Sequence, residues 1–370
     1  MNAQFSKTKS LSLEQRIGQL FFIGISGPVI DGETHRLLSE IKPGGVCLFA
    51  RNIKEPAQTR DLLENVTKDL EIQPFLSIDQ EGGLVDRLRR ILTPMPAVNK
   101  LRNTDNAREL ASIIAESLRI LGFNVNFAPV VDVIDQNREQ ANNGMYSRAF
   151  GKGTSDVIEM AGAFLDEMQA GGIIGCLKHF PGLGAAEADS HEELPTVSID
   201  DKELRETDLC AYREIDSQSE VGMIMIAHAA YPNTDLQERD QNGRLLPSSL
   251  SYNFVTKLLR NEMVFDGVAI TDDLEMGAIT KAYGIGEACK MAVKAGNDML
   301  AICAGENSIR EGFSAIFSAV ESGEIAESRI DESIQRIADL KSKIAVPIEF
   351  DPAKLDALSE RVKQLNARLN

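Results

Sequence analysis

The segment "DVIEMAGAFLDEMQAGGIIGCLKHF", residues 156–180, contains one helix followed by one strand. Residues 156–172 have an amphipathic helical pattern and end in a glycine pair, which suits a helix C-cap. Residues 172–180 form a continuous apolar run, which is typical of a strand covered on both faces. The run ends in Lys178 and His179, two ionisable residues. The segment therefore predicts a parallel sheet flanked by helices.

The same alternation continues along almost the whole chain. Seven further apolar runs predict strands at 20–24, 44–50, 74–79, 125–133, 222–228, 267–273 and 298–303. Amphipathic helices lie between them, and Ser12 with Gln15 predicts a capping box at the start of the first one. Eight strands with no intervening linker predict a single (β/α)8 TIM barrel over residues 1–345. An open doubly wound sheet is the alternative, but no glycine-rich phosphate-binding motif follows the first strand.

Residues 346–370 are predicted to form a C-terminal helical extension. Its apolar residues recur at three- and four-residue steps: Leu355, Leu358, Val362, Leu365 and Leu369. Such a stripe indicates an amphipathic helix. We expect it to pack on the barrel as a brace, while a contact between two copies of the chain is the alternative interpretation. A monomer or a weak homodimer is therefore expected.

The composition excludes several classes of partner and cofactor. A net charge of −17 over 370 residues argues against nucleic acid. The five cysteines are scattered without metal-ligand spacing, so neither a metal cluster nor a disulfide framework is expected. No apolar run approaches the roughly 18 residues of a membrane span. The first residues do not resemble a secretory signal, and a cytoplasmic protein is expected.

Ionisable residues end several of the predicted strands. They are Asp79, Lys178, His179, His228, Asp272 and Asp273. Because barrel enzymes carry their chemistry at the carboxyl ends of the strands, we expect these side chains to gather at one rim. Clustered titratable groups in one cleft favour a catalytic or binding site over independent structural roles.

Three kinds of chemistry fit this set poorly. The chain has only four histidines and neither an HxH nor an HExxH motif, which disfavours a metal-dependent hydrolase. Lys178 stands beside His179 at a polar strand end, whereas a Schiff-base lysine needs an apolar setting. The G-x-S-x-G elbow of serine hydrolases is missing.

Displacement at a sugar carbon fits better. That reaction needs a rigid carboxylate nucleophile and a proton donor on the opposite face of the sugar. Asp272 or Asp273 could be the nucleophile. Since adjacent strand residues point to opposite faces, only one of them is expected to face the barrel mouth, and the pattern leaves open which.

Asp189 and His191 are candidates for the proton donor. They lie two residues apart in a loop, where a carboxylate bonded to the imidazole would allow the ring to give and take a proton. The alternative interpretation of Asp-Ser-His is an ordinary turn with a surface histidine. The residues alone leave both interpretations open.

Several longer motifs are similar to those of a known family. They are "SIDQEGGLVDR" (77–87), "YSRAFG" (146–151), "KHFPG" (178–182) followed by "DSH" (189–191), "IAHAAYP" (226–232) and "AITDDLEMGAI" (269–279). With them the chain resembles glycoside hydrolase family 3, and within it the single-domain bacterial β-N-acetylglucosaminidases (β-hexosaminidases) of peptidoglycan recycling. The resemblance extends from residue 12 to about residue 340.

The resemblance implies a role for each candidate residue. Asp272 is then the nucleophile, His191 the general acid/base and Asp189 its partner. The residues that hold the N-acetylglucosamine ring are then Asp79, Arg87, Arg148, Lys178 and His179. The implied enzyme removes terminal β-GlcNAc from muropeptides by double displacement with retention, without a metal or organic cofactor. The loop 182–191 is rich in glycine and alanine, and we expect His191 to swing toward bound substrate.

Two positions depart from the family pattern, and two other functions stay open. Leu183 stands where His or Arg is more common, and Glu275 where Ser is common. We expect Leu183 to affect loop packing or leaving-group preference. A β-N-acetylglucosaminide phosphorylase is one alternative function, because a neutral imidazole would not repel phosphate. A catalytically inactive sugar-binding barrel is the other.

Overall fold

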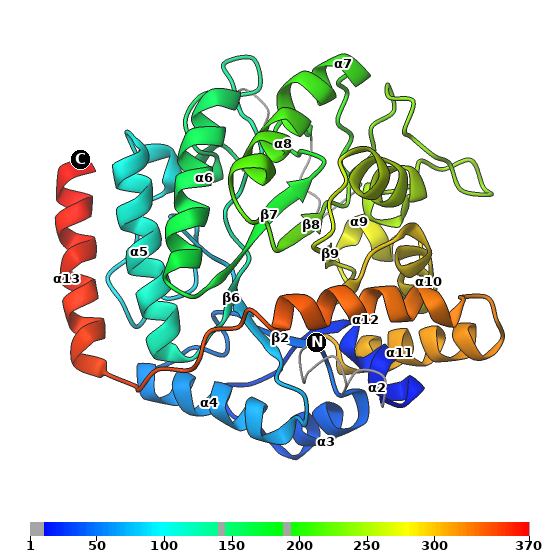
Figure 1. The fold of residues 1–370 in the computed structure, drawn as a ribbon, viewed down its shortest axis with the longest axis horizontal. Helices are drawn as coiled ribbons and strands as arrows, with labels where there is room; N and C mark the ends of the chain where they lie inside the picture. Colours follow the sequence, from blue (N-terminus) through cyan, green and yellow to red (C-terminus); the bar gives the residue numbers. More distant parts are fainter. Residues whose placement is uncertain (1–10, 140–144, 188–193, 370) are drawn as a thin grey trace.

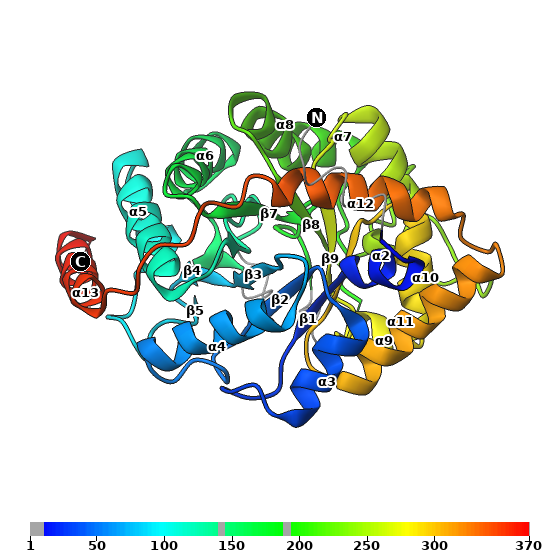
Figure 2. The same cartoon turned by 60° about the horizontal axis from the view of Figure 1, so that its bottom comes forward.

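The structure, a computed structural model, describes residues 11–139, 145–187 and 194–369. Eight parallel strands close into a barrel (Figure 2). Their spatial order is β1, β10, β9, β8, β7, β6, β3 and β2. Their bounds are β1 Phe21–Gly24, β2 Gly45–Leu48, β3 Phe75–Ile78, β6 Val125–Asn126, β7 Ile174–Phe180, β8 Met223–Ile226, β9 Val268–Asp273 and β10 Met299–Ile302. The predicted (β/α)8 barrel is confirmed. A short antiparallel hairpin, β4 (Gln80–Gly82) and β5 (Val85–Asp86), follows β3.

Helices surround the barrel (Figure 1). They are α2 Leu13–Gln19, α3 Gly32–Ile41, α4 Pro56–Asp69, α5 Thr104–Leu121, α6 Thr154–Ala170, α7 Asp201–Glu203, α8 Leu209–Gln218, η5 Asn253–Glu262, α9 Gly277–Thr280, α10 Ile285–Ala295, α11 Glu306–Glu321, α12 Glu327–Lys341 and α13 Pro352–Leu369. Ser12 caps α2 with the predicted capping box. The C-terminal α13 lies beside α5 and buries its whole leucine and valine stripe (Figure 1).

One predicted strand is much shorter than expected. The run at 125–133 yields only the two residues of β6. Beyond it the chain stays beside β7 through separate backbone bonds, Val131 N to Lys178 O (2.8 Å) and Cys176 N to Ala128 O (2.9 Å). Pro129 has no N–H to donate, which prevents a regular ladder here. The segment nevertheless delivers Asp132 to the carboxyl end of β7, where its side chain contacts His179.

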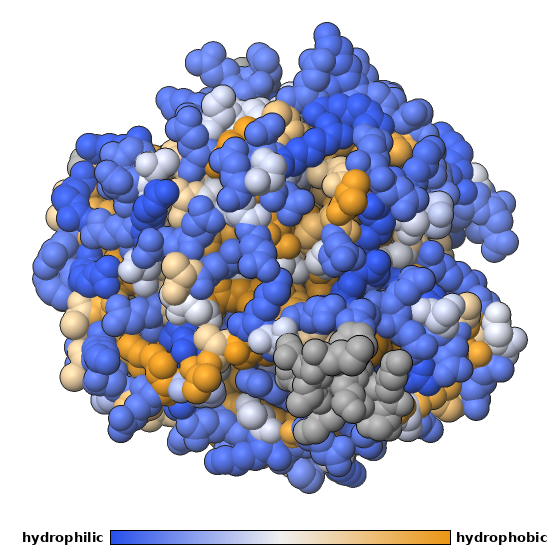
Figure 3. Space-filling model, viewed as in Figure 1, coloured by the Kyte–Doolittle hydropathy of each residue, from blue (hydrophilic) through white to orange (hydrophobic). Residues whose placement is uncertain are grey.

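The core lies inside the barrel and between its strands and helices. Phe22 packs on Phe75 and Phe127, with ring centroids 6.3 and 5.1 Å apart. At the amino-terminal end of the strands, buried Asp298 accepts hydrogen bonds from Arg260, Ser333 and other neighbours. Figure 3 shows a largely hydrophilic outer face with apolar residues between. No helix in the described ranges has both the length and the apolar character that a bilayer crossing requires.

Candidate active site

A cavity of about 390 Å³ opens at the carboxyl ends of the strands. Six of the residues predicted from the sequence line it: Asp79, Arg87, Arg148, Lys178, His179 and Asp272. They come from β7, from β9 and from the segments that follow β3, β5 and β6, so the fold brings together residues far apart in the sequence. Asp189 and His191 lie outside the described residues.

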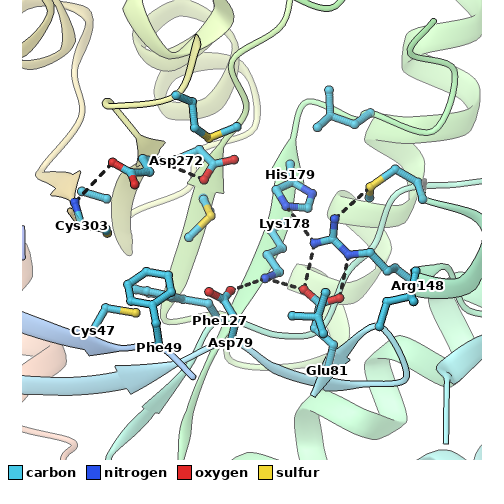
Figure 4. Close-up of a pocket in the computed structure, with 18 of the residues that line it drawn as sticks. Cys47, Phe49, Asp79, Glu81, Phe127, Arg148, Lys178, His179, Asp272 and Cys303 are labelled. Atoms are coloured by element: carbon cyan, nitrogen blue, oxygen red, sulfur yellow. Dashed lines mark hydrogen bonds and ion pairs between the residues drawn. The ribbon is translucent and has the colours of Figure 1, made fainter. Parts of the chain in front are cut away.

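A buried ion-pair cluster forms one wall of the cavity (Figure 4). Lys178 Nζ lies 2.6 Å from Asp79 Oδ1 and 2.6 Å from Glu81 Oε1. Arg148 binds Glu81 in bidentate fashion at 2.8 and 2.9 Å. The sequence reasoning missed Glu81, although it stands inside the quoted motif "SIDQEGGLVDR" two residues after Asp79. A carboxylate two residues from a strand-end aspartate was the available signal.

Mutual ion pairing favours the charged forms of Glu81, Lys178 and Arg148. Burial alone would raise the pKa of Glu81, but Lys178 and Arg148 outweigh it and the pKa is lowered. Burial would lower the pKa of Lys178, but Asp79 and Glu81 raise it. The pKa of Arg148 is raised in the same way against its burial, mainly by Glu81. The wall therefore offers fixed donors and acceptors that need no rearrangement when hydroxyl groups bind.

The β4–β5 hairpin carries Glu81 and Arg87 to the cavity. Gly82 and Gly83 turn the chain with φ of 97° and 60°, and a Cβ on Gly82 would lie 2.4 Å from Pro96 O. The buried Gln80 side chain donates to Asp86 and accepts from the Arg87 backbone N–H at 2.9 Å. The Arg87 guanidinium lies 6.0 Å from the ring centre of Phe49, another residue of the cavity wall.

The expectation that only one of Asp272 and Asp273 faces the barrel mouth is wrong, because both line the cavity. The reason is an irregularity in the ladder. Ile270 pairs with Met299 and Asp273 pairs with Ala301, so β9 has one residue more than β10 at this point. Such a bulge breaks the alternation of side chains, and bulges of this kind occur often beside active sites.

A similar bulge occurs in β7. Leu177 pairs with Ile224 and Phe180 pairs with Ile226, so two residues of β7 stand opposite one of β8. The two are Lys178 and His179, and both reach the cavity. Two bulges therefore deliver two adjacent pairs of ionisable side chains into one site.

The two adjacent carboxyls differ in their surroundings. Burial would raise the pKa of Asp272, but His179, His228, the Asp273 backbone N–H and Lys178 outweigh it, and the pKa lies below its usual value. Burial raises the pKa of Asp273 to about 7, and the charges of Glu275 and Asp272 add to the effect. Asp273 Oδ1 accepts from the backbone N–H groups of Glu275 (3.1 Å) and Cys303 (3.3 Å). Asp272 is therefore the more readily ionised member of the pair.

His228 does not line the cavity, although it ends a predicted strand. It is fully buried, with Nε2 3.1 Å from Asp273 O and Nδ1 2.7 Å from Ser249 Oγ. A carbonyl can only accept, so Nε2 carries the proton and supports the backbone of β9. Burial lowers the pKa of His228. Its role is to hold the strand end that carries the two carboxyls.

Asp132 is the second residue that the sequence reasoning missed. Its buried carboxylate lies 2.8 Å from His179 Nδ1 and accepts from Leu183 N at 2.6 Å. It lies within the predicted strand 125–133, near its end, so the strand-end rule applied to the other candidates would have found it. The partner of that carboxylate is 47 positions away, however, and only the fold identifies it.

The two departures from the family pattern have distinct surroundings. Leu183 is buried, lines the cavity and donates its backbone N–H to Asp132. Glu275 accepts hydrogen bonds from the backbone N–H groups of Ala304 (2.6 Å) and Gly305 (2.9 and 3.1 Å). Glu275 thus joins the segment after β9 to the segment after β10, beside the carboxyl pair.

The arrangement suits a polyhydroxylated ligand. A carboxylate kept ionised stands on one strand, and charged hydrogen-bonding groups of both signs stand across the cavity (Figure 4). In the described ranges no group of three or more His, Cys, Asp or Glu side chains is arranged to hold a metal ion.

Comparisons with known proteins agree on one family. Residues 12–340 match the Glycosyl hydrolase family 3 N terminal domain. A β-hexosaminidase of Pseudomonas aeruginosa is 35% identical over 288 residues, which cover 76% of this chain and 81% of that protein. A β-hexosaminidase of Nitrosomonas eutropha is 32% identical, over 83% and 88% of the two chains. A family 3 β-N-acetylglucosaminidase from Paenibacillus superposes with a TM-score of 0.87 at 34% identity, over 96% of this chain and 69% of that one.

Proposed function

The chain belongs to glycosyl hydrolase family 3, and on that premise we propose that it is a retaining exo-β-N-acetylglucosaminidase acting on peptidoglycan fragments. Family membership and relatives above 30% identity make it a glycoside hydrolase, a β-N-acetylhexosaminidase. The finer proposal names the bond, the stereochemical course and the residues. It is that the enzyme removes a non-reducing terminal β-GlcNAc from muropeptides.

One observation carries the assignment of the nucleophile. Asp272 lies at the carboxyl end of β9, lines the cavity and keeps a pKa below its usual value despite burial. A nucleophilic carboxylate must be ionised before the reaction and rigidly held. Its Oδ1 accepts from the Asp273 N–H at 2.8 Å, which fixes the carboxylate orientation. Asp273, with a pKa near 7, is a poorer nucleophile.

The opposite wall supports a role in holding the sugar. Asp79 can accept from ring hydroxyls, while Lys178 and Arg148 can donate to them. Arg87 and His179 line the same space. Because these groups are already oriented by one another, binding of a sugar here costs the protein little further conformational freedom. The bound sugar can then place its anomeric carbon near Asp272.

We assign the proton transfer to His191, with Asp189 as its partner. In the first step Asp272 attacks the anomeric carbon, the bond to the leaving oxygen breaks, and His191 gives that oxygen its proton. In the second step His191 takes a proton from water, whose oxygen attacks the same carbon and releases Asp272 as a carboxylate. Two inversions give net retention. Asp189 would hold the imidazole and raise its proton affinity.

The stereochemistry and the intermediate test this mechanism. Proton NMR of the first product from 4-nitrophenyl β-GlcNAc should show the β-anomer of GlcNAc before mutarotation. A fluorinated GlcNAc fluoride, which slows the second step, should label the peptide that contains Asp272, as read by mass spectrometry. An α-anomer, or a label on another carboxylate, would overturn the mechanism.

Substrate and cellular location belong to the same proposal. All five cysteines are free, which is compatible with the reducing cytoplasm where peptidoglycan fragments would be recycled. The test compares GlcNAc–anhydro-MurNAc peptides with chitobiose, each with and without inorganic phosphate. A higher kcat/KM for the muropeptide, with free GlcNAc as product, is expected. Preference for chitobiose would overturn the substrate assignment, and GlcNAc-1-phosphate as main product would overturn hydrolysis.

A further inference from the structure

We propose that Asp132 is a positioning residue that fixes the tautomer of His179, with the proton on Nδ1 and Nε2 presented to the cavity as an acceptor. No role for Asp132 follows from the sequence motifs, and it does not itself line the cavity. This proposal rests on the proposed function for the identity of the ligand, and it adds a residue that controls ligand binding. The tautomer of His179 itself can be measured without any ligand.

The first support is the placement of the Asp132 carboxylate. It is fully buried, and each of its oxygens has a different close donor. Oδ2 lies 2.8 Å from His179 Nδ1, and Oδ1 lies 2.6 Å from the Leu183 backbone N–H. The His179 backbone N–H adds longer contacts of 3.3 and 3.4 Å. One carboxylate therefore joins the bulged end of β7 to the segment that follows it.

The second support is the environment of the other ring nitrogen. His179 Nε2 lies 3.4 Å from a terminal nitrogen of Arg148 (Figure 4). A guanidinium has only donors and stays charged, so Nε2 must accept at this contact. An imidazolium would place a second N–H against that cation. The carboxylate on one side and the guanidinium on the other thus select the same tautomer.

The tautomer of His179 determines which hydrogen-bond donors and acceptors the cavity presents to a ligand. Lys178 and Arg148 supply donors, and His179 Nε2 supplies an acceptor beside Arg148. A ligand hydroxyl that donates to Nε2 and accepts from Arg148 would satisfy both groups at once. A ring in the other tautomer would present an N–H to the Arg148 guanidinium and leave that hydroxyl without an acceptor. Asp132 therefore acts on ligand binding through His179.

Asp132→Asn is the diagnostic variant because it keeps the shape and removes one acceptor. An amide has a single acceptor oxygen, whereas His179 Nδ1–H and Leu183 N–H need one each. Whichever way the amide turns, an NH₂ group faces one of these donors. Asp298→Asn is the matched control: Asp298 is equally buried but lies before β10, at the amino-terminal end of the barrel.

The direct measurement is imidazole NMR of the full chain labelled with ¹⁵N-histidine. His228 serves as an internal reference, because its contacts select the opposite tautomer, with the proton on Nε2. His179→Gln and His228→Gln assign the signals. In the wild type at pH 8, His179 should show a protonated Nδ1 and an unprotonated Nε2. A protonated Nε2 on His179 in the wild type would overturn the proposal.

Kinetics test the consequence for binding. With 4-nitrophenyl β-GlcNAc, Asp132→Asn should raise KM at least tenfold and lower kcat less, with an altered His179 spectrum. Asp298→Asn should lower Tm and leave KM and the spectrum unchanged. Asp132→Asn with KM and spectrum both within twofold of wild type would contradict the proposal. If the wild type cleaves no aryl β-hexosaminide, the proposed function fails, while the wild-type NMR spectrum still decides the tautomer.

Discussion

Asp272 and Asp273 are consecutive residues of one strand, and the pKa values of their carboxyl groups move in opposite directions. The pKa of Asp272 lies below its usual value, and that of Asp273 is raised to about 7. Both face the same cavity because the ladder between β9 and β10 contains a bulge. Pairs of titratable groups that are driven apart in this way commonly divide the tasks of an active site.

The first prediction separates these two carboxyls. Asp272→Asn should lower kcat on 4-nitrophenyl β-GlcNAc by at least about 10³-fold, because the nucleophile is lost. Asp273→Asn should lower it less than about tenfold, because an amide oxygen can still accept from Glu275 N and Cys303 N. Steady-state kinetics at pH 7 checks both. Equal losses in the two variants would contradict the assignment.

The second prediction concerns Glu81. Glu81→Gln leaves the Arg148 guanidinium without its bidentate carboxylate and Lys178 with Asp79 alone. Breaking a buried ion pair from one side destabilises a protein by about 3 kcal/mol or more, and the sugar-binding wall should also lose its order. Urea unfolding should report the loss of stability, and KM should rise. In the control, Glu220→Gln, the carboxylate is exposed beside Lys343, and unfolding free energy should change by less than about 0.5 kcal/mol.

The third prediction concerns Glu275, one of the two departures from the family pattern. Glu275→Ser removes the acceptors of Ala304 N and Gly305 N and should cost about 1 kcal/mol of unfolding free energy. Removing a negative charge beside Asp273 should also lower the pKa of that carboxyl. Thermal unfolding and the pH profile of kcat check the two effects. Glu321→Ser, at the far end of α11, should alter neither.

The fourth prediction concerns Lys341 at the base of the barrel. Its Nζ donates to Gln19 Oε1 at 2.7 Å and lies 5.3 Å from the Phe75 ring centre, and burial lowers its pKa to about 7. The unfolded amine keeps its proton to about pH 10. Between pH 7 and 10 the unfolded chain therefore binds more protons, and the unfolding free energy rises with pH by up to about 1.4 kcal/mol per unit.

Lys341→Met should remove this dependence. The variant should be more stable than the wild type at pH 7, and the difference should shrink toward pH 10. Urea unfolding at several pH values measures it. Lys343→Met, which replaces a half-exposed lysine, should leave the slope unchanged. Parallel pH curves for Lys341→Met and wild type would show that the buried amine keeps its proton.

Several features follow from local pattern and could be predicted. Continuous apolar runs predicted eight strands because parallel strands covered on both faces need no polar side. The capping box at Ser12 and the stripe from Leu355 to Leu369 follow from helical spacing. The strand-end rule placed Asp79, Lys178, His179 and Asp272 at one rim, and all four line the cavity.

Other features depend on partners that are distant in sequence. The strand at 125–133 shortens to two residues. Pro129 lies beside β7 in the barrel and has no N–H to donate to a regular ladder there. Glu81 becomes part of the site through Arg148 and Lys178, and Asp132 through His179. The sequence around a single acidic residue does not indicate which cation or imidazole will contact it in the fold.

The sequence by itself therefore determined the barrel, its rim and most of the charged residues there, because apolar periodicity and strand ends are local properties. Tertiary structure alone decided which way those residues point and moved the pKa values of Asp272 and Asp273 apart. One extra residue in β7 and one in β9 overrule the two-residue alternation, so Lys178 and His179, like Asp272 and Asp273, enter the cavity as pairs. The physical reason is that bulges and pKa values arise from neighbouring strands and opposing charges, which only the closed barrel brings together.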